Sequence, residues 1–327
     1  MKLAFFKAHH LAYDYVKEWE DENKIKVDII DERISPDNVD ILADYDGLAM
    51  TLPKSFDNSI YERLHDLGLK QIALTSVGYD IFDLEKARKN DIIITNVPDY
   101  SPESIAEFTV MMILKALKKD KEIQNNLKDN DYRQRENILG QTFKGKTLGI
   151  YGLGRIGQHV AKIANAFGAN VVSYSSRGKK DIDGVRFLSS YDELLKESDI
   201  ITIHSALTDE NYHFFDKKAF AKMKDGAMLF NCARGGLINT EDLLDAIDSG
   251  KIAFAGLDVY ENEKVINGRK DPNYQDEILD RLLSNDRVDY YPHISYLTNT
   301  SLENQVKYAL NAVVEVLQTG DSKNRIN

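Results

Sequence analysis

Three residues in the second half of the chain could together act on a carbonyl group: Arg234, Glu263 and His293. An arginine presents a planar fork to a carboxylate or carbonyl oxygen, and a histidine can transfer a proton near neutral pH. A glutamate beside the imidazole would hold it and favour its charged form. Each residue alone would more often belong to a surface ion pair, but each also follows a short apolar run. The combination predicts carbonyl reduction at the carboxyl ends of strands, where α/β sheets bind ligands.

A glycine-rich turn, Gly152-Leu153-Gly154-Arg155-Ile156-Gly157, precedes these residues in the chain. It lies between a strand expected at 146–151 and a helix, and a second strand is expected at 170–174. In such a unit, Gly152 permits a tight turn, Gly154 lets the backbone approach a pyrophosphate, and Gly157 allows close packing of helix and strand. The helix N-terminus offers free N–H groups and a positive dipole. The motif predicts a dinucleotide site, and the alternative is an ordinary strand-to-helix turn.

The end of the second strand bears on which dinucleotide binds. About twenty residues past the first glycine, an NAD site places an Asp or Glu on the ribose 2′-hydroxyl. Here the chain has Ser175, Ser176 and Arg177, followed closely by Lys179 and Lys180. A carboxylate about 4 Å from a 2′-phosphate would be repelled by roughly 4 kcal/mol at an effective dielectric near 20. We therefore expect NADP(H) to be favoured and NAD(H) to remain possible. If the basic cluster is only a solvated turn, NAD is still the cofactor.

Composition limits the class of protein. The chain has 327 residues, of which 43% are apolar and 29% charged, so we expect a globular protein of about two domains. A net charge of −11 disfavours nucleic acid and anionic membranes, and no apolar run is long enough to span a bilayer. The single cysteine, Cys232, cannot form an internal disulfide, and no signal peptide follows Met1. We expect a cytoplasmic protein with a small-molecule substrate and no metal site.

Short apolar runs alternate with amphipathic stretches in the first hundred residues, which predicts an α/β domain with a parallel sheet. We expect its helices at 12–22 and 60–67 and its strands at 2–8, 26–30, 47–51, 72–75 and 92–95. A terminal helix at 301–317 has apolar residues at helical spacing and could return to this domain. The predicted substrate domain comprises residues 1–100 plus 298–327 and is flavodoxin-like.

The predicted second domain, residues 101–297, is a Rossmann dinucleotide-binding domain, so the fold class is two doubly wound parallel-sheet α/β domains. Ser101, Pro102 and Glu103 predict the start of a helix that runs to 118, and the polar segment 119–135 is interpreted as a linker. A helix is expected at 240–249, capped by Asn239 or Thr240. Further strands are expected at 199–204, 227–231, 253–257 and 288–291. The helix after the glycine turn should bury Ile156, Val160, Ala161, Ile163, Ala164 and Phe167 and end at Gly168.

Several segments in order resemble the NAD(P)-dependent D-2-hydroxyacid dehydrogenase family, especially its D-lactate and D-2-hydroxyisocaproate branch. Besides the glycine turn, they are Asn96-Val97-Pro98-Asp99-Tyr100-Ser101-Pro102, Asn231-Cys232-Ala233-Arg234-Gly235-Gly236, Leu257-Asp258-Val259-Tyr260-Glu261-Asn262-Glu263 and Tyr291-Pro292-His293-Ile294-Ser295. The similarity extends over essentially the whole chain. It implies an enzyme that reduces a 2-oxoacid to a D-2-hydroxy acid by hydride transfer from a nicotinamide cofactor.

The resemblance also implies residue roles. His293 would protonate the developing alkoxide, Arg234 would polarise and orient the substrate, and Glu263 would keep His293 charged. The substrate would further contact a backbone cradle and two tyrosines, namely Ser76, Val77, Gly78, Tyr100 and Tyr296. The cofactor would contact Gly152, Gly154, Arg155, Ile156, Gly157, Ser175, Ser176, Arg177, Cys232, Ala233 and Asp258. Two of these have structural alternatives: Tyr100 could cover the domain hinge, and Cys232 fits a packed residue better than a nucleophile.

Departures from the family pattern leave substrate and partners open. His204-Ser205-Ala206 stands where relatives often have His-Val-Pro, and Tyr296 is a single aromatic where the lactate branch commonly has two. Lactate specificity therefore does not follow. The resemblance implies a homodimer formed through the second domain and the helix at 101–118. The alternative function is a dinucleotide-sensing binding protein, like the corepressor relatives that share this scaffold.

Overall fold

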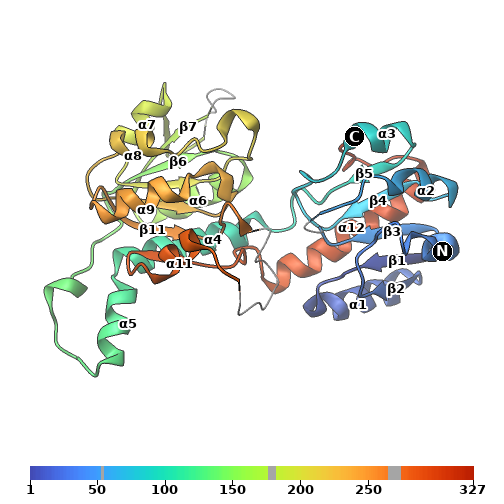
Figure 1. The fold of residues 1–327 in the computed structure, drawn as a ribbon, viewed down its shortest axis with the longest axis horizontal. Coiled ribbons are helices and arrows are strands. Elements are labelled where there is room, and N and C mark those ends of the chain that lie inside the picture. The colour runs from blue at the N-terminus through green and yellow to red at the C-terminus, as the bar shows by residue number, and fades with distance from the viewer. Residues whose placement is uncertain (53–54, 176–181, 264–273) are drawn as a thin grey trace. The chain divides into compact units, whose positions relative to one another are not determined.

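The computed structural model describes residues 1–52, 55–175, 182–263 and 274–327 (Figure 1). The chain forms two compact units, one of Met1–Ser101 with Leu297–Asn327 and the other of Pro102–Tyr296. We call them the first and the second unit. Of the predicted cofactor residues, Ser176 and Arg177 lie outside the described part of the chain.

The first unit is built on a five-stranded parallel sheet in the order β2-β1-β3-β4-β5. This order is that of flavodoxin-like domains and confirms the predicted fold class. The strands are β1 (Lys2–Phe6), β2 (Lys26–Ile30), β3 (Gly47–Met50), β4 (Gln71–Leu74) and β5 (Ile93–Thr95). The helices around them are α1 (Tyr13–Asn23), α2 (Ile60–Asp66), α3 (Leu84–Lys89) and α12 (Asn299–Thr319).

Helix α12 joins the first unit although it comes from the far end of the chain. Thr298 caps it by accepting a hydrogen bond from the backbone N–H of Ser301, and Gly320 ends it in the left-handed region at φ 82°. Its buried stripe packs on the sheet and includes Leu302, Val306, Ala309, Leu310, Val313 and Val316. The apolar spacing of the sequence predicted this helix and its packing.

The second unit contains a seven-stranded parallel sheet in the order β12-β11-β10-β9-β6-β7-β8. This is the doubly wound Rossmann order with an added edge strand. The strands are β6 (Thr147–Tyr151), β7 (Asn170–Tyr174), β8 (Val185–Phe187), β9 (Ile200–Ile203), β10 (Ala227–Asn231), β11 (Ile252–Leu257) and β12 (Val288–Tyr290). The helices are α4 (Pro102–Leu117), α5 (Asp120–Lys128), α6 (Arg155–Ala166), α7 (Tyr191–Glu197), α8 (Lys217–Lys222), α9 (Thr240–Asp248) and α11 (Glu277–Ser284).

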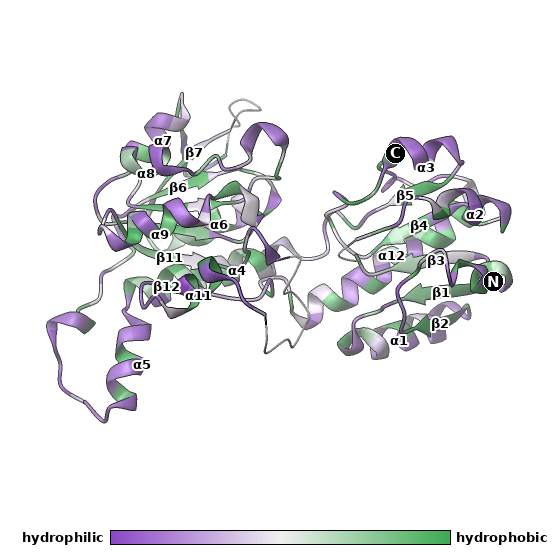
Figure 2. Cartoon of the chain, in the orientation of Figure 1, coloured by the Kyte–Doolittle hydropathy of each residue, from purple (hydrophilic) through white to green (hydrophobic). Residues whose placement is uncertain are grey.

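The interpretation of 119–135 as a linker is wrong in part, because α5 occupies half of it. No residue of α5 is buried, and the segment contains too few apolar residues to predict a helix from their spacing. Local contacts hold it instead: Lys119 pairs with Glu122 at 2.9 Å, and Lys121 Nζ donates to the carbonyl of Val288 at 2.7 Å. Figure 1 shows α5 extending away from the body of this unit, and Figure 2 shows polar colouring along most of it.

The expectation that Phe167 belongs to the inner face of α6 is also wrong. The helix ends at Ala166, and the Phe167 side chain is 46% exposed beside Phe143. Gly168, at φ 78°, then turns the chain toward β7 as predicted. Among the described helices, none combines the length and the apolar character needed to cross a bilayer.

Candidate functional site

A histidine and a glutamate form a close pair at the carboxyl edge of the second sheet. His293 Nδ1 lies 2.9 Å from Glu263 Oε1, and the other carboxylate oxygen accepts from the backbone N–H of Tyr260 at 3.2 Å. Burial alone would lower the pKa of His293, but the hydrogen bond and charge of Glu263, with the charge of Asp258, outweigh it. The pKa of His293 is therefore raised above its ordinary value. Such an imidazolium can still donate a proton near neutral pH.

The loop that carries His293 is fixed by Asp258, which directly follows β11. The backbone N–H groups of Ile294 and Ser295 donate to its two carboxylate oxygens at 2.8 and 2.9 Å, and the N–H of His293 donates to its carbonyl at 2.8 Å. His293 itself adopts the left-handed region at φ 59°. Asp258 is fully buried, and burial raises its pKa despite these bonds. In this arrangement its carboxylate shapes the histidine loop.

Arg234 follows β10 and belongs to the same site. Asn231 braces the turn before it: its side-chain NH2 donates to the Arg234 carbonyl, and its side-chain oxygen accepts from the Ala233 N–H, both at 2.9 Å. The Arg234 guanidinium donates to the Ala233 carbonyl at 2.8 Å. Its positive charge opposes protonation of His293 without overcoming the acidic residues. The structure thus brings Arg234, Glu263 and His293 together in one unit.

The glycine turn between β6 and α6 has the geometry of an anion cradle. Gly152 adopts φ 96°, and a Cβ there would lie 2.7 Å from the carbonyl carbon of His204. A Cβ on Gly157 would meet the Gly152 oxygen at 2.4 Å, whereas one on Gly154 would meet nothing within 4 Å. Gly154 is also the N-cap of α6 and supplies no side-chain cap. The open backbone and uncapped helix start fit a pyrophosphate.

The residues around this turn differ in exposure. Arg155 is exposed, and Ile156 is half-buried and packs against the core beneath α6. Ser175 is partly exposed just after β7. His204 is half-buried beside the turn, where its Nε2 lies 3.0 Å from the Thr202 hydroxyl and desolvation of the ring lowers its pKa to about 3. The His204 imidazole is therefore neutral and lies against the glycine turn.

Cys232 is a packed residue in this structure. It is 7% exposed, and the Thr109 hydroxyl donates to its sulfur at 3.3 Å. Burial, with a contribution from Asp258, raises the pKa of the Cys232 thiol to about 12. A thiol with that pKa is not a nucleophile at neutral pH. Its neighbour Ala233 is partly exposed and packs on the core of the second unit.

Two predicted substrate elements belong to the first unit. The Ser76-Val77-Gly78 loop follows β4, and all three of its backbone carbonyls accept hydrogen bonds. The Gly78 carbonyl accepts from the Ser76 hydroxyl, the Val77 carbonyl from the Asn96 side chain, and the Ser76 carbonyl from the Val97 N–H. Tyr100 packs in the cluster beneath α12, and its carbonyl accepts from the Asn304 side chain at 2.7 Å. Tyr296 lies in the second unit, with its ring edge-on to His293 at 6.3 Å between centroids.

The sequence reasoning missed a second histidine–glutamate pair. His213 Nε2 lies 2.7 Å from Glu261 Oε2, and Glu261 Oε1 accepts from the backbone N–H of Thr240 at the start of α9. Glu261 stands two residues before Glu263, and its acidic side chain shortly after a strand is the signal that the sequence offers for it. Nothing in the sequence around His213 pointed to this pairing.

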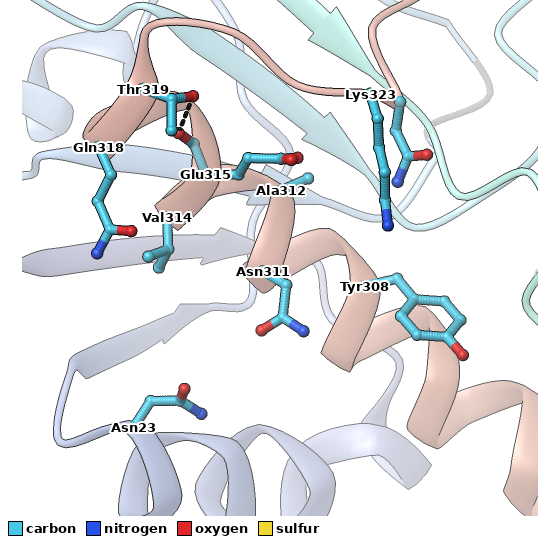
Figure 3. Close-up of a pocket in the computed structure, with 10 residues that line it drawn as sticks. Asn23, Tyr308, Asn311, Ala312, Val314, Glu315, Gln318, Thr319 and Lys323 are labelled. Atoms are coloured by element: carbon cyan, nitrogen blue, oxygen red, sulfur yellow. Dashed lines mark hydrogen bonds between the residues drawn. The ribbon is translucent and has the colours of Figure 1, made fainter.

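A polar groove in the first unit contains none of the predicted site residues. It has a volume of about 440 Å³ and is shown in Figure 3. It runs along α12 and is lined by Asn23, Tyr308, Asn311, Ala312, Val314, Glu315, Gln318, Thr319, Lys323 and Asn324. None of these lining residues lies within a strand of the first unit. Within the described residues, no cluster of His, Cys, Asp and Glu could hold a metal ion.

Comparison with known proteins gives consistent matches. The model of the family described as "D-isomer specific 2-hydroxyacid dehydrogenase, NAD binding domain" matches residues 110–295. A D-lactate dehydrogenase of Staphylococcus aureus (strain MRSA252) is 36% identical over 328 residues, covering 100% of this chain and 99% of the relative. A Clostridioides difficile protein named D-2-hydroxyacid dehydrogenase (NAD(+)) is 37% identical over 332 residues, covering 100% of both. The crystal structure of D-lactate dehydrogenase with NAD+ from Lactobacillus jensenii matches with a TM-score of 0.90 and 32% identity, covering 100% of this chain and 99% of that one.

Proposed function

Because the chain belongs to the D-isomer-specific 2-hydroxyacid dehydrogenase family, we propose that it reduces a 2-oxoacid to a D-2-hydroxy acid with Arg234, Glu263 and His293 as its catalytic residues. The chain is an enzyme of that family. The observation that carries the assignment of residues is the 2.9 Å contact between His293 and Glu263, in a site that also holds the charge of Arg234.

Each catalytic residue has a distinct task in the proposed mechanism. The nicotinamide cofactor supplies the hydride when bound. His293, held as imidazolium by Glu263, donates its proton to the oxygen of the substrate carbonyl as negative charge develops there. Arg234 orients the substrate and stabilises that charge through its planar fork. In the reverse direction, neutral His293 accepts the proton of the hydroxyl group.

The cofactor is NAD(H) at the level of the family, and we place its pyrophosphate at Gly152, Gly154 and Gly157. The open position at Gly154 and the uncapped start of α6 support this placement. A preference for NADPH remains a proposal from the sequence alone. It depends on Ser175, Ser176 and Arg177, and one relative is named for NAD(+).

The remaining binding residues are proposed from the resemblance. The first unit would present the Ser76–Gly78 backbone N–H groups to the substrate carboxylate and Tyr100 to its body. Tyr296, beside His293, would limit the size of the side chain. The second unit would hold the cofactor, with Arg155, Ile156, Cys232, Ala233 and Asp258 around it. The proposed domain limits are 1–100 plus 298–327 and 101–297.

A homodimer formed through the second unit, including the helix predicted at 101–118 and observed as α4, is the proposed assembly. Three large apolar side chains in and after α5 are exposed, namely Leu127 at 42%, Tyr132 at 76% and Leu139 at 75%. Exposed apolar residues in one stretch favour an interface, here with a second copy. Cytoplasmic location remains a prediction from the sequence. No observation favours the dinucleotide-sensing alternative, since the relatives compared above are named as dehydrogenases.

The test is turnover with a panel of 2-oxoacids. Oxidation of NADH and of NADPH would be followed separately with pyruvate, 2-oxoisocaproate, phenylpyruvate and hydroxypyruvate. We expect turnover in the wild type and its loss in His293→Ala with cofactor binding retained. Turnover with NADH alone would refute the NADPH preference and still support the dehydrogenase activity. Unchanged turnover in His293→Ala would refute the role of His293.

A further inference from the structure

The pair formed by His213 and Glu261 links three parts of the second unit. Glu261 accepts from the His213 ring at 2.7 Å with one oxygen and from the Thr240 N–H at 3.1 Å with the other. The Glu261 side chain is 13% exposed and that of His213 is 27% exposed. A partly buried charge that is hydrogen-bonded through both oxygens fixes the backbone that carries it more firmly than a surface pair does.

The same pair touches the loop that follows Arg234. The backbone N–H of His213 donates to the Gly236 carbonyl at 2.8 Å, and that of Phe215 donates to the Leu237 carbonyl at 3.0 Å. On the other side, Gly235 presses against the Glu261 segment: a Cβ there would lie 2.1 Å from the carbonyl carbon of Tyr260. The Arg234 loop is therefore held between the chain around His213 and the segment that ends in Glu263.

The His213 residue is itself held in place. Its backbone lies in the left-handed region at φ 52°, which is uncommon for a non-glycine residue. Its ring stacks on Tyr212 at 4.0 Å between centroids, and the Asn239 side chain approaches its Nδ1 at 3.5 Å. Asn239 also caps α9. The ring thus has contacts on its face and at both nitrogens.

We propose that His213 and Glu261 are positioning residues, which set the Arg234 loop and the Glu263 segment at the spacing that the reaction on the 2-oxoacid requires. The inference rests on the proposed function for its kinetic consequence. Neither residue is placed on the substrate: Glu261 uses both oxygens within the protein. Loss of the pair would let the two segments shift independently. A shift of about 1 Å at reacting groups can reduce rates on the order of 100-fold.

The test compares His213→Gln, Glu261→Gln and Glu261→Asp with a matched control. The control is Lys251→Gln, which breaks the Lys251–Asp225 ion pair on the surface of the same unit, 2.7 Å long. Four quantities are measured for each: the thermal midpoint, kcat, KM for the 2-oxoacid, and the pKa of His293 by NMR titration. The charged and titratable groups that influence His293 are Glu263, Asp258 and Arg234, and all three stay intact in every variant.

We expect Glu261→Gln and His213→Gln to lose kcat/KM on the order of 10- to 100-fold, with KM raised and the pKa of His293 lowered. Glu261→Asp should recover part of both effects, and Lys251→Gln should show neither. Wild-type kcat, KM and His293 pKa in the two Gln variants would overturn the inference, whatever the change in thermal midpoint. If the wild type shows no turnover but the His293 pKa still falls in the variants, the proposed function fails and the positioning role stands.

Discussion

At the scale of the residue, the site depends on a balance at one imidazole. Burial disfavours the charged form of His293, and Glu263 and Asp258 together reverse that effect. Because the pKa of His293 is raised in the folded protein, its charged form stabilises the fold fully at pH values below the ordinary histidine pKa. This stabilisation is lost as the pH rises through the raised pKa. Proton donation for carbonyl reduction should follow the same course.

Glu263→Gln tests this balance directly. The amide keeps the shape of the side chain but removes its charge, so the pKa of His293 should fall. We expect the decline of kcat/KM for 2-oxoacid reduction at high pH to begin at lower pH, and the rate at neutral pH to drop at least on the order of 10-fold. Steady-state pH profiles measure both. Asp225→Asn, which removes an exposed charge from the same unit, is the control and should keep the wild-type pH profile. If Glu263→Gln also keeps the wild-type pH profile, the proposed role of Glu263 is wrong.

Arg234→Lys tests the fork at the other side of the site. Lysine keeps the charge but cannot present two parallel N–H groups to a carboxylate or carbonyl oxygen. KM for the 2-oxoacid should rise and kcat should fall, together by a factor on the order of 100, while the affinity for NADH stays close to that of the wild type. Steady-state kinetics and a cofactor titration separate these effects. Wild-type values of both kcat and KM would rule out the proposed role.

The sequence predicted the meeting of Arg234, Glu263 and His293 because each follows a strand of one parallel sheet, and the carboxyl ends of such strands share an edge. It could not predict His213, whose link to Glu261 depends on a left-handed turn and on the path of a loop. It also assigned Asp258 to the cofactor by resemblance alone, whereas the structure engages both carboxylate oxygens with the histidine loop. Such contacts arise from tertiary packing and leave no periodic trace in the chain.

At the scale of the element, the sequence predicted most strands and the amphipathic helices. It did not predict short or exposed elements that are stabilised by local contacts. The glycine turn is predicted by an anion-binding motif, and α12 is predicted by a stripe of apolar residues at helical spacing. Helix α5 has no buried face and is held by lysine contacts, and β8 is a short edge strand of three residues. Phe167 was misassigned because it stands one residue beyond the end of α6.

Gly154→Ala tests the turn as a cofactor cradle. A methyl group there would meet no atom of the protein within 4 Å, so stability to urea should change by only a few tenths of a kcal/mol up to about 1 kcal/mol. It would occupy the space through which a pyrophosphate approaches the helix start, and NADH affinity should fall on the order of 10-fold or more. Cofactor titration and unfolding curves give both values. Unchanged affinity in a folded variant would place the pyrophosphate elsewhere. Gly226→Ala, at a turn where φ is 75°, is the control for affinity: it should cost more stability than Gly154→Ala and leave NADH affinity unchanged.

At the scale of the whole molecule, length and composition indicated about two domains, and the alternation of apolar and amphipathic stretches indicated the α/β class. The order of motifs indicated the family. The topology of both sheets could be predicted because strand-helix alternation leaves few ways to build a parallel sheet. The proposed homodimer interface cannot be predicted from the alternation of strands and helices. Of the exposed apolar residues, Leu127 and Tyr132 lie in the segment 119–135 that was interpreted as a linker, and Leu139 follows it.

Leu139→Asp tests the proposed homodimer. Leu139 is 75% exposed, so the folded single chain should tolerate the change, whereas an apolar interface would not accept the added charge. We expect the wild type to sediment as a dimer and the variant to dissociate at concentrations where the wild type does not. Leu11→Asp, at a 53% exposed leucine of the first unit, should remain dimeric. A monomeric wild type, or a variant as stable in its dimer as the wild type, would rule out this interface.

The most direct test of the central claim is the rate of NADH and NADPH oxidation by 2-oxoacids, measured with wild type and His293→Ala and with the configuration of the product determined. The account predicts turnover in the wild type, a product of the D configuration, and a loss of most of that turnover in a variant that still binds the cofactor. Full turnover in His293→Ala, or a product of the L configuration, would contradict it.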